Sequence, residues 1–337
     1  MPQTVRVGTR ASTLALTQTG HVADALAALA DLDVETVRVR TEGDRVAAPL
    51  ASLGGTGVFV TALRDALLAG RCDVAVHSLK DLPTQPAPGL TVAAVPPRAD
   101  PRDALCARDG LTLATLPPGA RVGTGSPRRA AQLRAARPDL DVVDVRGNVE
   151  TRLRRVRGLV VTPASDAPPA PDAGAAAAGP RDDLDAVVLA AAGLGRLGRL
   201  DAVTQLFDPD LLAPAPGQGA LAVEVRTADA DAASPLAQAL RTLDHAPTRR
   251  AVVAERAVLA RLEAGCAAPV GAWGRFDDAG TLVLDAVVCA TDGTRVLRRS
   301  TSGPAPDDSA AHALGVALAQ QLVDDGAADL APLGASS

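Results

Sequence analysis

Arginines and hydroxyl-bearing residues recur where a strand pattern ends and a helix pattern begins. Ligands of open α/β sheets bind at the carboxyl ends of the strands, so these joints predict a binding site. Guanidinium groups bind carboxylates or phosphates through paired hydrogen bonds, and several arginines together predict a ligand with several such anions. The candidate binding residues at the joints are Arg10, Ser12, Ser78, Lys80, Thr124, Ser126, Arg128, Arg129, Arg146, Arg152 and Arg196.

The joint at 124–129 favours an anion most strongly. Ser126 is a good N-cap and Pro127 suits the first helical position, so free backbone N–H groups point toward the joint beside Arg128 and Arg129. Arginine at a helix N-terminus opposes the helix dipole by about 0.3–1 kcal/mol, and its repeated use needs a compensating anion. Each arginine alone could instead be a solvated residue at a helix start. No GxxxxGK[ST] loop occurs, which disfavours a nucleotide.

Lys80 and Asp81 stand out in a chain with a strongly biased composition. Lys80 is the only lysine among 34 basic residues, and Asn148 is the only asparagine. Under such a bias these two positions are of interest, although each could be a chance survivor on a surface loop. A carboxylate among cations, such as Asp81, could stabilise a cationic intermediate or relay a proton. A surface salt bridge is the alternative for Asp81.

The four cysteines are widely spaced and form no CxxC pair, which argues against a zinc site or a disulfide scaffold. Cys72, Cys106 and Cys289 lie in or beside apolar strand patterns and are predicted to be buried. Cys266 differs, because Gly265 ends a helix and places it on a loop, where a thiolate could act as a nucleophile. The residues alone also allow a structural role for Cys266. His77, at the end of a buried strand, fits a core histidine better than a general base.

Alternating strand and helix patterns predict an α/β fold with two lobes like those of periplasmic binding proteins, a cleft between them, and a small C-terminal α+β domain. Pro-rich crossings near 96–101 and 214–219 predict domain 1 over residues 1–98 and 218–242, domain 2 over 102–214 and domain 3 over 244–337. Residues 162–181 contain 5 Pro and 8 Ala among 20, so they are expected to form a mobile insert in domain 2.

The composition limits the classes of protein to which this chain could belong. A chain of 337 residues with 47% hydrophobic content can build several cores, and a net charge of −5 gives no reason to expect nucleic acid or a membrane surface as a partner. Apolar runs fall short of a membrane span, and the N-terminus carries no signal-type segment, which predicts a cytoplasmic protein.

Several blocks together resemble the porphobilinogen deaminase family, also called hydroxymethylbilane synthases. The resemblance runs from about residue 4 to about residue 300. It rests on RVGTRAS, AVHSLKDLP, ADPRDAL, GTGSPRRAAQL, RGNVETRL, LAAAGLGRLG, APGQGA and RLEAGCAAPVG.

The resemblance implies a transferase that joins four porphobilinogen molecules head to tail, with release of ammonia, into hydroxymethylbilane (preuroporphyrinogen) in porphyrin and heme biosynthesis. It implies a dipyrromethane cofactor attached covalently through a thioether to Cys266, and no metal. Asp81 corresponds to the catalytic carboxylate that stabilises the cationic azafulvene-type species. The binding residues correspond to those named at the joints, with Gln218 added. The implied protein is a cytoplasmic monomer that binds neither nucleic acid nor membranes.

Two departures and two alternatives accompany the resemblance. Thr56 stands where the family often has lysine, and the insert at 162–181 is longer than expected. A two-lobed protein that binds or senses an anionic ligand without catalysis would share the fold pattern. An enzyme that uses Lys80 as a Schiff-base nucleophile is the second alternative, which the arginine-rich surroundings disfavour.

Overall fold

The structure is a computed structural model that describes residues 3–39, 57–159, 183–264, 268–331 and 333, with only the backbone at 57–59. Thr56, the insert at 162–181 and Cys266 therefore lie outside the described residues. The chain divides into two compact units, the first made of Met1–Ala99 and Ala220–Arg249, the second of Asp100–Gly219 and Arg250–Ser337.

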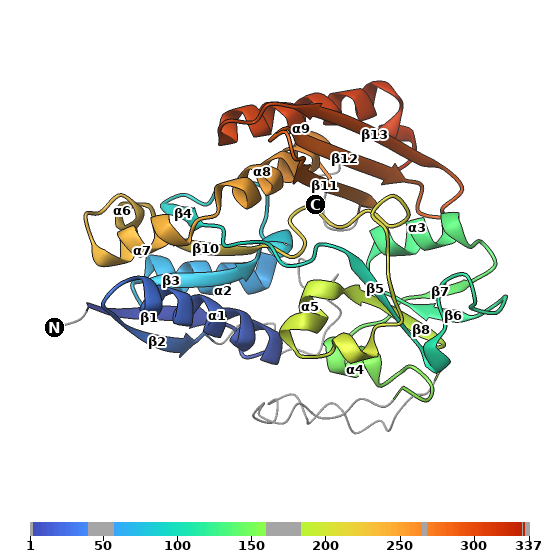
Figure 1. Cartoon of the computed structure of the whole chain (residues 1–337), viewed down its shortest axis with the longest axis horizontal. Coiled ribbons are helices and arrows are strands. Elements are labelled where there is room, and N and C mark those ends of the chain that lie inside the picture. Colours follow the sequence, from blue (N-terminus) through green and yellow to red (C-terminus); the bar gives the residue numbers. More distant parts are fainter. Residues whose placement is uncertain (1–2, 40–56, 160–182, 265–267, 332, 334–337) are drawn as a thin grey trace. The chain divides into compact units, whose positions relative to one another are not determined.

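The first unit contains a five-stranded sheet with the strand order β2-β1-β3-β10-β4 (Figure 1). Strand β1 runs parallel to β2 and β3, whereas β10 is antiparallel to both β3 and β4. The strands are β1 (Gln3–Thr9), β2 (Leu32–Arg38), β3 (Val74–Ser78), β4 (Leu90–Ala94) and β10 (Leu221–Arg226). The last strand comes from the second segment of this unit, so the chain returns to complete the sheet.

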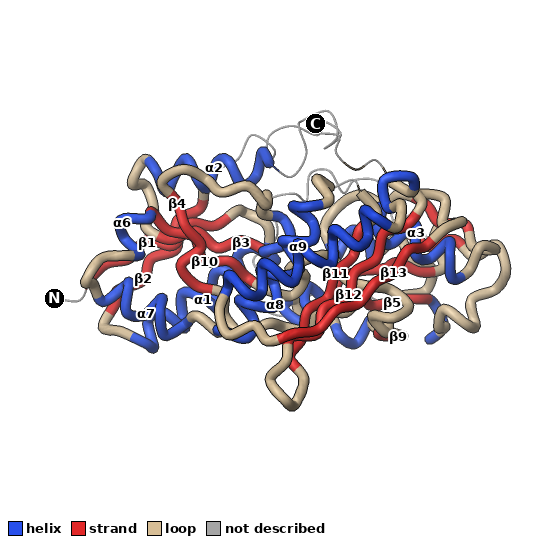
Figure 2. The backbone as a smooth tube through the Cα atoms, turned by 90° about the horizontal axis from the view of Figure 1, so that it is seen from above, coloured by secondary structure: helices blue, strands red, loops and turns tan. Residues whose placement is uncertain are grey.

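Helices cover both faces of this sheet. Helices α1 (Thr13–Leu29) and α7 (Pro235–Leu243) share one apolar core with the strands. Helix α2 (Gly57–Leu68) packs on the opposite face through a second cluster that includes Leu63, Leu67 and Cys72. Figure 2 shows α2 on one side of the strands and α1 with α7 on the other. The short α6 (Thr227–Ala230) follows β10.

The second unit contains a five-stranded sheet with the order β7-β6-β8-β5-β9. Strand β6 is parallel to β7 and β8, while β5 is antiparallel to β8 and pairs with β9 at the edge. Helix α3 (Pro127–Ala136) packs on one face, and α4 (Val149–Leu153) and α5 (Ala191–Arg196) pack on the other. The strands are β5 (Asp103–Ala107), β6 (Arg121–Gly123), β7 (Asp141–Val143), β8 (Ala186–Ala190) and β9 (Gln205–Leu206).

A separate three-stranded antiparallel sheet completes the second unit (Figure 1). It consists of β11 (Val270–Phe276), β12 (Leu282–Cys289) and β13 (Val296–Gly303). Helices α8 (Ala246–Arg261) and α9 (Asp308–Asp324) cover one face of this sheet. Their apolar residues form one core with those of the strands. Gly315 of α9 faces the backbone carbonyl of Ala254 in α8, and a Cβ there would collide with it, so glycine permits the close helix crossing.

The predicted α/β class is confirmed: both five-stranded sheets are mixed and helix-covered, and the third sheet with its two helices forms an α+β region. The three predicted domains and their bounds stay predictions, and the second unit includes both the predicted domain 2 and the predicted domain 3. The apolar strand pattern expected at or beside Cys106 corresponds to β5, whose residues are all buried. Among the described residues, no helix is long and apolar enough to cross a membrane.

Candidate active site

In the first unit, the predicted residues lie at one edge of the sheet. Strands β1 and β3 are parallel neighbours, so Arg10 and Ser12 after β1 lie at the same edge as the residues after β3. The Ser12 hydroxyl accepts a hydrogen bond from the Ala15 N–H at 3.3 Å and caps α1. The Ser78 hydroxyl donates to Gln18 of α1 at 3.2 Å. This edge is therefore held by contacts between the strand ends and α1.

Lys80 and Asp81 lie on a single 3₁₀ turn, Leu79–Asp81, directly after β3. Leu79 is 3% exposed, and its N–H donates to the Ala220 carbonyl at 3.0 Å. The Leu82 N–H donates back to the Leu79 carbonyl at 3.2 Å and closes the turn. Because both ends are anchored, the half-buried Lys80 and Asp81 project from a fixed backbone.

The strand that leads into this turn contacts a buried carboxylate, Glu224. His77 Nε2 is 3.1 Å from Glu224 Oε2 on β10, and Arg64 of α2 donates to both oxygens of Glu224. Burial would raise the pKa of Glu224, but hydrogen bonds from His77 and Arg64 outweigh it and lower that pKa below its ordinary value. His77 is 6% exposed, which agrees with the interpretation of a core histidine.

In the second unit, strands β6, β7 and β8 are parallel, so their carboxyl ends meet at one edge. The structure brings seven predicted residues to the segments that follow these strands. They are Thr124, Ser126, Arg128, Arg129, Arg146, Arg152 and Arg196. Thr124 and Ser126 shape the turn before α3, where the Thr124 hydroxyl accepts from the Ser126 N–H at 3.2 Å and Ser126 caps α3.

Arg128 and Arg129 are buried and share the carboxylate of Asp103. Arg128 Nη1 lies 2.8 Å from Asp103 Oδ2, and Arg129 Nη2 lies 2.7 Å from Oδ1. Asp103 is the first residue of β5 and pairs with Ala190, the last residue of β8, so the antiparallel strand delivers a carboxylate to the carboxyl-end edge. Sequence reasoning missed Asp103, whose signal was an acidic residue opening an apolar strand.

Gln218 completes this cluster. Its side chain is fully buried and its Nε2 donates to Asp103 Oδ1 at 2.8 Å and to the Pro101 carbonyl at 2.7 Å. Arg128 and Arg129 approach its Oε1 at 3.5 Å. We call Asp103, Arg128, Arg129 and Gln218 the Asp103 cluster.

The other three arginines differ in burial. Arg146 is exposed and pairs with the equally exposed Asp144 at 3.0 Å. Burial lowers the pKa of Arg152, and the nearby charges of Arg129 and Arg146 lower it further. Arg196 donates to the Gly219 carbonyl at 2.7 Å, and burial lowers its pKa as well.

Positive charge is in excess at this edge. Two carboxylates, Asp103 and Asp144, form the ion pairs of Arg128, Arg129 and Arg146 within the described residues. Arg152 adds a partly desolvated fourth cation. The Nε of Arg128 is buried without a hydrogen-bond partner in the described part of the chain. An anionic ligand with several carboxylates suits such a donor set.

Asn148, the only asparagine, caps α4. Its Oδ1 accepts from the Thr151 N–H at 2.8 Å and from the Thr151 hydroxyl at 2.9 Å. Asn148 thereby fixes the first turn of the helix that carries Arg152, so it positions the edge rather than forming a chance surface residue.

The three cysteines within the described residues are free and buried, as predicted. Burial raises the pKa of Cys106 to about 12 and that of Cys289 to about 11, and it also raises the pKa of Cys72. None of these thiols has the environment of a nucleophile.

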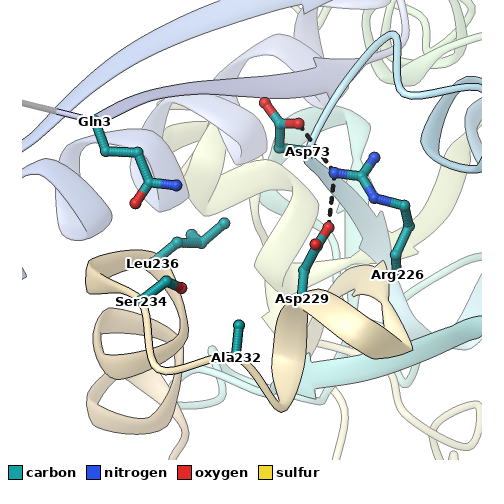
Figure 3. Close-up of a pocket in the computed structure, with 7 residues that line it drawn as sticks. All are labelled: Gln3, Asp73, Arg226, Asp229, Ala232, Ser234 and Leu236. Carbon is teal, nitrogen blue, oxygen red and sulfur yellow. Dashed lines mark hydrogen bonds and ion pairs between the residues drawn. The ribbon is translucent and has the colours of Figure 1, made fainter.

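A small hollow in the first unit lies away from these residues, at the opposite ends of β1 and β3 (Figure 3). Arg226 borders it and pairs with Asp73 at 3.1 Å and Asp229 at 2.6 Å, while also donating to the Leu67 and Cys72 carbonyls. The charge of Arg226 is satisfied within the fold, so the hollow offers no cationic site.

Comparison with known proteins decides the family. Residues 5–234 match the family domain described as "Porphobilinogen deaminase, dipyromethane cofactor binding domain", and residues 249–324 match the C-terminal domain of the same family. The chain belongs to the porphobilinogen deaminase family. It is 56% identical to the porphobilinogen deaminase of Leifsonia xyli, covering 98% of this chain and 94% of the relative. It is 54% identical to that of Cutibacterium acnes, covering 98% of both chains.

Solved structures give weaker matches. A lipoprotein of the YaeC family from Enterococcus faecalis aligns with a TM-score of 0.37 and 14% identity over 72% of this chain and 92% of that one. A TRAP periplasmic solute binding protein from Desulfovibrio salexigens aligns with a TM-score of 0.38 and 11% identity over 72% of this chain and 73% of that one. The fold assignment therefore rests on the sheets described above.

Membership in the porphobilinogen deaminase family confirms the predicted class of activity, a transferase of porphyrin biosynthesis, and the predicted dipyrromethane cofactor. The roles assigned to individual residues stay predictions.

Proposed function

We propose that this member of the porphobilinogen deaminase family joins four porphobilinogen molecules head to tail into hydroxymethylbilane and releases one ammonia for each unit joined. The observation that carries the proposal is the excess of buried and half-buried arginines over carboxylates at the edge formed by β6, β7 and β8. Pyrroles of this pathway each carry an acetate and a propionate, so a growing chain supplies the anions that these cations require.

The residues present fit the dipyrromethane cofactor. Its carboxylates, and those of each porphobilinogen unit as it is joined to the chain, would be held by Arg128, Arg129, Arg146, Arg152 and Arg196, with Thr124, Ser126 and Gln218 as further polar contacts. An added carboxylate would give the unpaired Nε of Arg128 a partner and would offset the repulsion that Arg129 and Arg146 exert on Arg152. When bound through a thioether to Cys266, the cofactor supplies the pyrrole end to which substrate is added.

In the first unit, Asp81 would act on the incoming porphobilinogen. Loss of its amino group leaves positive charge on the substrate pyrrole, and the Asp81 carboxylate offsets that charge and can take up a proton. The anchored 3₁₀ turn holds Asp81 in place while the charge develops. Arg10, Lys80, Ser12 and Ser78, at the same sheet edge, would bind the substrate carboxylates.

We further propose that the protein is a cytoplasmic monomer without affinity for nucleic acid. The net charge of −5 supports the last point, because a bulk negative charge opposes binding to phosphate backbones. Sedimentation of the purified protein with and without duplex DNA tests the monomeric state and the absence of affinity for nucleic acid.

The direct test of the proposed activity is incubation of the purified protein with porphobilinogen. We expect ammonia to appear at the rate at which porphobilinogen disappears, together with a linear tetrapyrrole identified by its mass. A protein that only binds or senses an anionic ligand would bind porphobilinogen without releasing ammonia, and that result would overturn the proposal. Trapping of Lys80 by borohydride in the presence of substrate would instead indicate Schiff-base chemistry.

A further inference from the structure

Residues 213–218, which we call the strap, are bonded on one side to α3. The Ala213 N–H donates to Gln132 Oε1 at 2.8 Å, and the Ala213 carbonyl accepts from Gln132 Nε2 at 3.2 Å and from Arg128. The same helix begins with Arg128 and Arg129 of the Asp103 cluster. The start of the strap is thus fixed by the helix that carries the buried arginines.

The strap is bonded on its other side to β11 of the C-terminal sheet. The Ala272 N–H donates to the Pro214 carbonyl at 3.0 Å. A Cβ placed on Gly271 would lie 2.9 Å from the Ala213 Cβ, so strand and strap are in close contact. The strap therefore connects the C-terminal sheet with the Asp103 cluster.

One carboxylate anchors the far end of the strap. Glu255 of α8 is fully buried; its Oε2 accepts from the Gly217 N–H at 2.6 Å, and its Oε1 accepts from the Gly274 N–H of β11 at 2.8 Å. Gly217 has a φ of +77°, which favours glycine, so the backbone that presents this N–H is tightly specified. A single side chain joins α8, β11 and the strap.

Gly217 immediately precedes Gln218, whose side chain donates to Asp103. We infer that Glu255 is a positioning residue: by fixing the Gly217 backbone it sets Gln218, and through Gln218 the guanidinium groups of Arg128 and Arg129, for binding the carboxylates of the pyrrole chain. The inference rests on the binding role proposed above for this cluster.

A carboxylate is required because both of its oxygens accept from backbone N–H groups. Glutamine has the same size but only one acceptor oxygen, and its NH₂ group would face one of the two N–H donors. That buried N–H would lose its partner. Glu255→Gln should therefore shift the strap without replacing either arginine of the Asp103 cluster.

The test compares Glu255→Gln, Gln218→Ala and the double variant with the matched control Asp285→Asn. Asp285 is a carboxylate of the same C-terminal sheet, 9% exposed, and its bonds go to Arg275 and Ser300 rather than to the strap. Each protein is assayed for cofactor content by intact mass, for thermal midpoint, and for KM and kcat with porphobilinogen.

We expect Glu255→Gln to keep its cofactor and to raise KM about tenfold, the effect of losing one well-placed hydrogen bond. Gln218→Ala should raise KM similarly, and the double variant should add little, because both changes act through one path. Asp285→Asn should keep the wild-type KM even where its thermal midpoint falls as much as that of Glu255→Gln.

A KM within twofold of wild type in Glu255→Gln, additive effects in the double variant, or the same KM rise in Asp285→Asn would each overturn the inference. If Glu255→Gln does not fold, Glu255→Asp takes its place: it keeps both acceptors but draws them back by one methylene, so KM should again rise, and an unchanged KM contradicts the role. Absence of ammonia release by the wild-type protein would instead refute the proposed function itself.

Discussion

Asp103 accepts hydrogen bonds from Nε and Nη2 of Arg129 at 3.0 and 2.7 Å while its own side chain is fully buried. Burial alone would raise the pKa of Asp103, but the charges of Arg128 and Arg129 and their hydrogen bonds hold it well below its ordinary value. Asp103 thus keeps two arginines in place inside the second unit and neutralises only part of their charge. The cluster therefore keeps a net positive charge, which the proposed function assigns to the binding of ligand carboxylates.

Arg128→Leu and Arg146→Leu should have different effects on stability. Arg128 is buried against Asp103, and breaking a buried pair by removing one partner costs about 3–5 kcal/mol. Arg146 and Asp144 are both about 60% exposed, so Arg146→Leu should unfold in urea close to wild type while losing cofactor or turnover. Equal destabilisation of the two variants, or full activity of Arg146→Leu, would contradict this assignment.

Asp103→Asn should reduce the dependence of the unfolding free energy on pH in the acidic range. Because the folded-state pKa of Asp103 lies below its ordinary 3.8, the ionised carboxylate stabilises the fold above that pH, and the contribution is lost as the pH falls through the folded-state value. The difference in unfolding free energy between wild type and variant should therefore be largest near pH 7 and shrink below about pH 4. Urea titrations at several pH values measure it, and a difference independent of pH would exclude the mechanism.

Asp81→Asn should retain the cofactor and lose turnover by about 10²–10³-fold, since the amide keeps the shape but cannot offset a developing cation. Single-turnover ammonia release is the measurement. Asp65→Asn, which changes an exposed carboxylate on α2 of the same unit, is the matched control and should keep wild-type activity. Near-normal ammonia release from Asp81→Asn would remove Asp81 from the mechanism.

The thiols of Cys72, Cys106 and Cys289 should resist alkylation in the native protein. All three are 0% exposed, and burial raises the pKa of each, so hardly any thiolate is present at pH 8. Iodoacetamide followed by peptide mapping should label them only after unfolding. Rapid native labelling of any of the three would show that its site opens readily.

Much of the candidate site could be predicted because strand ends and helix starts are local features. Ser126 is an N-cap in both the sequence pattern and the structure, and the structure shows that Asn148 caps α4; each fixes the helix that carries the neighbouring arginines. Parallel strands then bring such joints to one edge without further information.

The partners of these arginines could not be predicted, because they arrive through long-range pairing. Asp103 reaches Arg129 only because β5 enters the sheet antiparallel to β8, and Glu255 reaches Gly217 only through the packing of α8 against the strap. Neither contact leaves a spacing signature in the sequence. The single local sign in the sequence was an acidic residue, Asp103, at the start of an apolar strand.

We propose that the protein builds its product on a pyrrole unit anchored at Cys266. The most direct test is the intact mass of the purified active protein, followed by mapping of any adduct to its peptide. We predict an excess mass of one dipyrromethane on the peptide that contains Cys266, and its loss in Cys266→Ser together with activity. A fully active protein with the mass of the bare polypeptide, or an adduct on Cys72, Cys106 or Cys289, would contradict the account.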